Sequence, residues 1–142
     1  MLKSLTIGLA VSLLAGMAIA ETHEVQMLNK GDAGTMVFEP GFLRVVPGDT
    51  VKFIATDRGH NAEAVKGMVP EGADIFKGKI NEEIEVTLET EGLYGVKCLP
   101  HFAMGMVMTI AVGEETALPD GFLAGRLPPK AKERFNEQLE DL

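Results

Sequence analysis

Residues 98–106 read CLPHFAMGM and bring several potential metal ligands together in one short segment. The segment contains the only cysteine of the sequence, Cys98, followed by His101 three positions later and by Met106 five positions after that. A second histidine, His60, lies far upstream in the sequence RGHN at residues 58–61. These side chains offer one thiolate, two imidazoles and one thioether. They form a candidate ligand set for a single metal ion.

Two histidines, one cysteine and a distant axial methionine are the ligand set of blue-copper electron-transfer sites. Met104, three positions after His101, is an alternative fourth ligand. We favour Met106 because it abuts the last predicted strand, which would hold it in place. Each residue alone has an ordinary explanation, such as a buried free cysteine or a solvated loop histidine. The prediction of a copper site therefore depends on their combination.

The first twenty residues have the pattern of a secretory signal peptide. A basic start, MLK, precedes an apolar run, and the small residues of AIA at 18–20 suit cleavage. The apolar run is shorter than the roughly 20 residues that a membrane-spanning helix needs. We therefore predict that residues 1–20 are a signal peptide, that the protein has no membrane anchor, and that residues 21–142 form one domain.

Charge and cysteine content narrow the possible functions. The chain has 21 acidic and 13 basic residues and a formal net charge of −8, so it has no general attraction for nucleic acid or anionic lipid. Export leads to an oxidising compartment, where cysteines usually form disulfides. A lone Cys98 cannot pair within the chain, which favours a specific role such as metal ligation.

Short alternating segments separated by glycine and proline turns predict a β-protein. Residues 83–89, EIEVTLE, alternate most clearly, and residues 50–55, TVKFIA, also alternate. One further strand runs into Cys98, and the last predicted strand covers residues 106–112. Seven or eight such strands, without intervening helices, predict an antiparallel sandwich rather than a parallel sheet.

The tail, about residues 114–142, is predicted to be a helical extension. Its acidic start suits a helix N-terminus, and the sequence PDG at residues 119–121 interrupts it. Two prolines then precede Ala131, Phe135 and Leu139, whose four-residue spacing predicts an amphipathic helix. We expect this helix to cover an open side of the sandwich rather than to bind a partner.

The sequence resembles the cupredoxins, and among them the pseudoazurins most closely. The resemblance rests on the C-x-x-H-x-x-x-x-M loop at residues 98–106 and on GHN at residues 59–61, and it extends over residues 21–142. It implies an all-β, Greek-key β-sandwich with a C-terminal helical extension and one type 1 copper ion. It also implies a monomeric periplasmic carrier, not an enzyme. Such a carrier passes single electrons to a reductase, typically copper nitrite reductase, and receives them from a cytochrome c or a similar donor.

The same resemblance implies roles for residues around the ligands. Asn61 would tie the two ligand loops together, and Met36 would pack on the ring of His101. Pro100 is expected near that ring because it precedes His101 in the same loop. Redox partners would dock around His101, steered by a small group of basic residues. In this group, Arg58 and Lys97 are chosen because they lie beside ligand residues in the sequence, and Lys30 and Lys77 are chosen from the resemblance.

Two other functions could use the same side chains. A thiol-dependent enzyme would use Cys98 as nucleophile and a histidine as base, although no family signature surrounds the cysteine. A copper storage or delivery protein would use the same soft ligands, although it would be expected to expose runs of Met and His. A structural zinc site is weaker still, because thioether is a poor zinc ligand.

Overall fold

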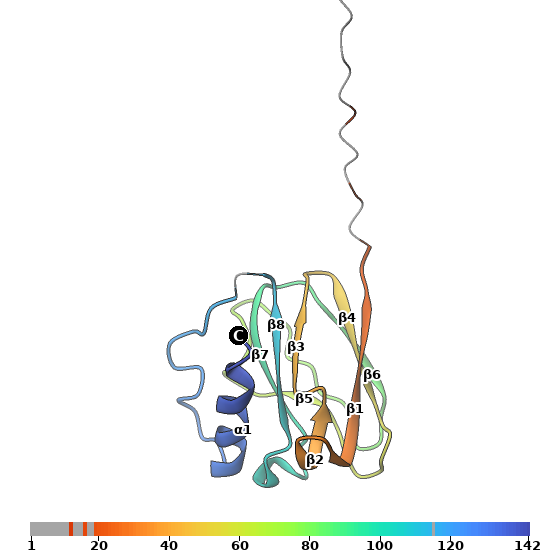
Figure 1. The fold of residues 1–142 in the computed structure, drawn as a ribbon, viewed down its shortest axis with the longest axis vertical. Coiled ribbons are helices and arrows are strands. Elements are labelled where there is room, and N and C mark those ends of the chain that lie inside the picture. Colours follow the sequence, from red (N-terminus) through yellow and green to blue (C-terminus); the bar gives the residue numbers. More distant parts are fainter. Residues whose placement is uncertain (1–11, 13–15, 17–18, 115) are drawn as a thin grey trace, which may run out of the picture.

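The computed structural model describes residues 12, 16, 19–114 and 116–142. The signal peptide predicted over residues 1–20 falls almost entirely outside the described residues. Within the described part the chain forms eight strands, one short 3-10 helix and one α-helix (Figure 1). The strands are β1 Thr22–Gly31, β2 Gly34–Glu39, β3 Phe42–Val45, β4 Asp49–Ile54, β5 Glu63–Ala64, β6 Ile84–Leu88, β7 Gly92–Lys97 and β8 Val107–Val112. The helices are η1 Phe102–Met104 and α1 Pro129–Leu139.

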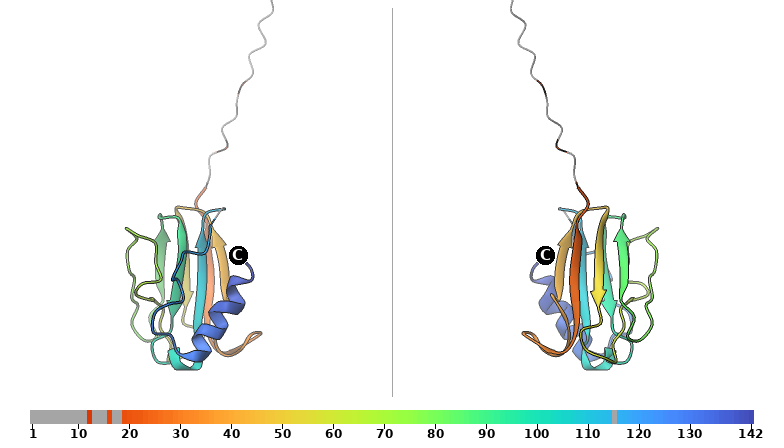
Figure 2. Two further views of the ribbon diagram at one scale, coloured as in Figure 1. Left: turned by 90° about the vertical axis from the view of Figure 1, so that its left-hand side faces the viewer. Right: turned by 90° about the vertical axis from the view of Figure 1, so that its right-hand side faces the viewer.

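The strands form two four-stranded sheets that pack face to face (Figures 1 and 2). The first sheet has the order β2-β1-β4-β6 and the second has the order β3-β8-β7-β5. The predicted β-sandwich is therefore confirmed. The sheets are mixed rather than wholly antiparallel, because β1 pairs with β4 and β3 pairs with β8 in parallel. These parallel pairs join strands that are not consecutive, and sequence alternation does not encode which strands pair.

The main core lies between the sheets and is built by alternation along the strands. On β1 and β4, Val25, Met27, Val51 and Phe53 point inward and are fully buried, whereas their neighbours are exposed or half-buried. Strand β8 differs, since every one of its residues is buried. Such a strand is central in its sheet and covered on both faces. The second face of β8 is covered by α1.

The tail is helical only in its last part, which corrects the prediction for residues 114–142. Helix α1 covers Pro129–Leu139, and residues 116–128 form turns and irregular backbone. Prolines and glycines recur through this segment, and they remove backbone donors and disfavour a continuous helix. The predicted stripe does face the sheet, because Ala131 and Phe135 are fully buried and Leu139 packs beside them. No helix among the described residues is long and apolar enough to cross a bilayer.

Candidate metal centre

The loop between β7 and β8 is a short, hydrogen-bonded turn that carries three of the candidate ligands. Cys98 follows the end of β7, and its backbone N–H donates to Met106 O at 3.0 Å, which closes the loop. Between them lies η1, which ends at Gly105 in the left-handed region with φ of +86°. A non-glycine residue is disfavoured there. The loop therefore reverses direction in a tightly defined path.

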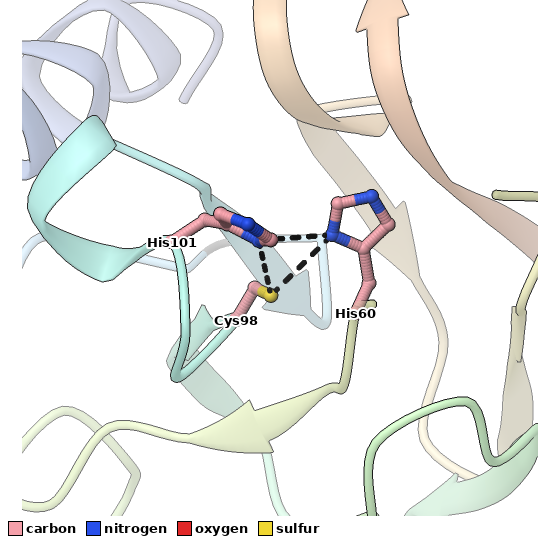
Figure 3. Close-up of side chains that lie close together, drawn as sticks. All are labelled: His60, Cys98 and His101. Atoms are coloured by element: carbon pink, nitrogen blue, oxygen red, sulfur yellow. Dashed lines mark hydrogen bonds between the residues drawn. The ribbon is translucent and has the colours of Figure 1, made fainter. Parts of the chain in front are cut away.

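His60, Cys98 and His101 direct their donor atoms toward one point (Figure 3). His60 Nδ1 lies 3.1 Å from His101 Nδ1, and Cys98 Sγ lies 3.7 and 3.6 Å from these two nitrogens. His60 and Cys98 are fully buried, whereas His101 is half-buried. Two histidines that lie 41 residues apart in sequence are thereby brought together with the single thiol.

The size of this triangle suits a metal ion. A point equidistant from three atoms at these separations lies about 2.0 Å from each, which is close to ordinary metal–nitrogen and metal–sulfur bond lengths of about 2.0 to 2.3 Å. Soft thiolate and imidazole donors favour copper or zinc over hard cations. The residues therefore fit a small, soft transition-metal ion.

His60 is held in the tautomer that metal ligation requires. Its Nε2 lies 2.8 Å from Asn29 Oδ1, and because the amide oxygen can only accept, the ring carries its proton on Nε2. The Nδ1 lone pair is then free to face the centre. Burial lowers the pKa of His60, and the nearby charge of His101 lowers it further. Both effects favour the neutral imidazole that binds metals.

Burial raises the pKa of the Cys98 thiol, so the protonated form is favoured while no cation is near. Backbone hydrogen bonds from Asn61 and His101 oppose this rise. These N–H groups stabilise negative charge on the sulfur. A cation at the centre of the triangle would complete that stabilisation, because metal ligation requires the thiolate.

Asn61 connects the two ligand-bearing loops. Its Oδ1 accepts a hydrogen bond from Leu99 N at 2.7 Å, next to Cys98. Its Nδ2 donates to Gly78 O at 3.1 Å and to Glu63 Oε2 at 3.3 Å. Since Asn61 is almost fully buried, these bonds are protected from water. The bond to Leu99 N runs from the loop of His60 to the loop of Cys98, and the role that the resemblance implies for Asn61 stays a prediction.

The two candidate methionines lie in different environments. Met106 is fully buried and belongs to the same core cluster as Cys98, whereas Met104 is 46% exposed. Met36 lies on β2, packs against the edge of the core and has a φ of +52°. Pro100 is exposed on the turn beside His101. The structure thus brings three of the four predicted ligands into contact and buries Met106 near them.

The four predicted docking residues differ in their surroundings. Lys30 and Arg58 are exposed. Lys97 Nζ lies 3.5 Å from Glu63 Oε1 and 4.8 Å from the centre of the Phe102 ring, and its side chain is only 21% exposed. Lys77 Nζ lies 4.0 Å from the same carboxylate but is mostly exposed. Two of the four charges therefore share one buried acidic partner.

Comparison with known proteins shows which family the chain belongs to. The family model for copper binding proteins of the plastocyanin/azurin family matches residues 25–113. A pseudoazurin of Paracoccus pantotrophus is 50% identical over 130 residues, which is 92% of this chain and 90% of that relative. The chain belongs to the pseudoazurin family. Pseudoazurins are cupredoxins that carry electrons and are not enzymes, and a type 1 copper ion is their cofactor.

Solved structures agree with this membership of the pseudoazurin family. The crystal structure of pseudoazurin from Methylobacterium extorquens AM1 superposes with a TM-score of 0.79 at 38% identity and covers 85% of this chain and 99% of that chain. Pseudoazurin from Hyphomicrobium denitrificans gives a TM-score of 0.79 at 44% identity and covers 85% and 98%. The thiol-enzyme interpretation is therefore wrong, and the prediction of a copper cofactor is confirmed.

Several residues around the centre of this pseudoazurin-family protein were not predicted. Asn29 fixes the tautomer of His60. Glu63 accepts a hydrogen bond from Asn61 and forms ion pairs with Lys77 and Lys97. Neither Asn29 nor Glu63 lies in a recognisable sequence motif. At the starts of β1 and β4, His23 Nε2 lies 2.9 Å from Oδ2 of the buried carboxylate of Asp49. Side-chain pairs so distant in sequence leave no local pattern.

Proposed function

We propose that His60, Cys98, His101 and Met106 hold one copper ion and that the protein shuttles single electrons between periplasmic redox partners. The convergence of three donor atoms on one point supports the ligand assignment most directly. Met106 is proposed over Met104 because a buried thioether beside Cys98 suits an axial ligand better than an exposed one. Copper bound there would supply a reversible one-electron couple between Cu(I) and Cu(II).

The half-buried His101 is the proposed port for the electron. Its Nδ1 faces the centre, and the loop around the ring exposes apolar side chains, with Leu99 at 50% and Met104 at 46% exposure. A small apolar patch suits brief docking, because transient redox encounters bury little surface. Met36 and Pro100 are proposed to line the same ring from its other sides.

The proposed acceptor is a reductase, with copper nitrite reductase as the leading candidate, and the proposed donor is a cytochrome c or a similar carrier. The predicted signal peptide supports a periplasmic location for the shuttle, and a mobile carrier of this size is proposed to act as a monomer. Lys30, Arg58, Lys77 and Lys97 are proposed to steer docking. Because Lys97 and Lys77 share Glu63, Lys30 and Arg58 are expected to contribute more of the steering.

Addition of Cu(II) to the purified copper-free protein tests the centre. We expect an intense blue or green colour that ascorbate bleaches, and we expect Cys98→Ser to abolish it. Met104→Leu should leave the colour unchanged, whereas Met106→Leu should alter the spectrum. A colourless product, or a colour that survives Cys98→Ser, would contradict the proposed site.

Stopped-flow oxidation of the reduced protein by copper nitrite reductase tests the partner. We expect the bimolecular rate to fall as salt increases, since steering between opposite charges is screened. Charge reversal of Lys30 and Arg58 should slow the reaction more than charge reversal of Lys132, which lies on α1. Rates that ignore both salt and charge reversal would refute steering by these residues.

A further inference from the structure

Arg134 of α1 donates hydrogen bonds to three backbone carbonyl groups from two separate parts of the chain. Its Nη1 lies 2.5 Å from Met36 O and 2.8 Å from Gly105 O, and its Nη2 lies 2.7 Å from Thr35 O. Thr35 and Met36 belong to β2 in the first sheet, whereas Gly105 belongs to the ligand loop. One planar guanidinium therefore joins the first sheet, the ligand loop and α1.

Both attachment points adjoin the candidate metal centre. Gly105 directly precedes Met106, whose N–H donates to His101 O at 3.1 Å and whose carbonyl accepts from Cys98 N. Met36 has a left-handed backbone that non-glycine residues adopt only when their surroundings hold them there. The bonds from Arg134 thus fix two pieces of backbone that flank the ligands.

Helix α1 is a rigid support for this side chain. Phe135, the next residue, is fully buried against the second sheet. Gln138 Nε2 donates to Val107 O at 2.9 Å, and its Oε1 accepts from Thr109 Oγ1 at 3.0 Å. The helix also lies beside η1 at the ligand end of the molecule (Figure 1). Groups that project from such a packed element are held in place more accurately than groups on a loop.

We propose that Arg134 is a positioning residue of the copper centre. From α1 it fixes the backbone of Gly105, and through it Met106, relative to Met36 in the first sheet. The proposal rests on the proposed assignment of Met106 as the axial ligand. Because the axial bond is long and weak, the position of the thioether follows the backbone that carries it, and the axial ligand tunes the redox potential of such sites. Arg134 therefore sets the reduction potential as well as stabilising the fold.

The chain contains a matched control at the other end of β8. Arg44 Nη1 donates to Gly113 O at 2.9 Å and to Glu114 O at 3.3 Å. Gly113 directly follows β8, just as Gly105 lies shortly before it. Arg44→Gln removes the same charge and the same kind of bond as Arg134→Gln, but far from the ligands. A comparison of the two variants separates positioning of the centre from general stabilisation.

Three measurements test the proposal on the full-length mature protein. They are the midpoint potential, the ratio of the visible absorption bands of the copper-loaded protein, and the hydrogen-exchange rate of the Met106 amide without copper. For Arg134→Gln we expect a changed potential, a changed band ratio and exchange faster by about tenfold or more. We expect Arg44→Gln to leave all three unchanged. Arg134→Lys keeps the charge but lacks the planar fork by which the guanidinium spans the three carbonyls, so it should change all three measurements in the same direction. It provides the test if Arg134→Gln does not fold.

Unchanged values in both Arg134 variants, or equal changes in Arg44→Gln, would overturn the proposal. Failure of the proposed function gives a different result, because the parent protein itself would then lack the visible colour. In that case the link to the potential is wrong as well. The amide exchange of Met106 would still show whether Arg134 holds the loop.

Discussion

Replacement of Gly105 by alanine should measure how closely α1 approaches the ligand loop. Gly105 has a φ of +86°, and a Cβ built there would lie 2.6 Å from Lys130 Cγ and 3.0 Å from Lys130 O. The left-handed backbone costs alanine about 1 to 2 kcal/mol relative to glycine. The contact with the helix backbone adds about 1 to 3 kcal/mol, as in other overpacked sites. We expect Gly105→Ala to lower the free energy of unfolding by about 2 to 5 kcal/mol.

Gly48→Ala is the matched control. Gly48 has a similar φ of +95°, but a Cβ there would meet no atom within 4 Å. It should therefore show only the backbone cost of about 1 to 2 kcal/mol. The difference between the two variants isolates the contact with α1, and Lys130→Ala in the Gly105→Ala background should recover part of it.

Urea unfolding of the copper-free protein, followed by circular dichroism, is the appropriate assay because bound metal would itself shift the equilibrium. Equal destabilisation by Gly105→Ala and Gly48→Ala would refute the argument. It would show that the helix yields readily at this point, and the rigid support inferred for Arg134 would lose its basis.

Three further predictions concern separate parts of the molecule. The backbone N–H of Glu21 holds the pKa of the buried Asp49 below its usual value of about 3.9. The ionised carboxylate therefore stabilises the fold above that pH, and this stabilisation is lost as the pH falls. Asp49→Asn should flatten the decline of the unfolding free energy between about pH 5 and pH 3, and an unchanged slope would count against this role. Phe135→Ala should cost about 3 to 5 kcal/mol in urea unfolding, since the ring is fully buried under α1, and a cost below about 1 kcal/mol would show that the helix packs loosely. Asn29→Leu removes the hydrogen-bond acceptor that orients the ring of His60. Copper affinity measured by competition with a chelator should fall by about 10- to 100-fold. An unchanged affinity would show that the His60 ring needs no such partner.

The ligands of the candidate site could be predicted from the sequence where they lie close together in the chain. Cys98 and His101 lie in one turn, and their spacing allows both to reach one point, as the structure shows. His60 could be proposed because the sequence contains only three histidines and because GHN at residues 59–61 resembles the cupredoxin pattern. The assignment of Met106 as the fourth ligand stays a prediction, supported by its burial.

The supporting contacts could not be predicted because they join distant residues. Arg134 bonds to backbone carbonyls 98 and 99 residues away, and carbonyl groups carry no side-chain signal in a sequence. Glu63 is buried, and its carboxylate bonds to Asn61 and lies 3.5 Å from Lys97 Nζ, 34 residues away in the sequence. In the tail, the spacing of Ala131, Phe135 and Leu139 predicts α1 correctly, whereas the prolines and glycines before it prevent the helix from starting near residue 114.

The position of β8 determines how late in folding the second sheet can form. It is the last strand in the sequence, yet it lies in the second sheet between β3 and β7, which pair with each other only through it. The second sheet therefore cannot form until residues 107–112 are available to pair with both strands, and α1 must then cover the outer face of β8. Folding that depends on such long-range pairing is slow. The thiol of Cys98, which directly precedes this late pairing in the chain, thus stays accessible until β8 has joined the sheet.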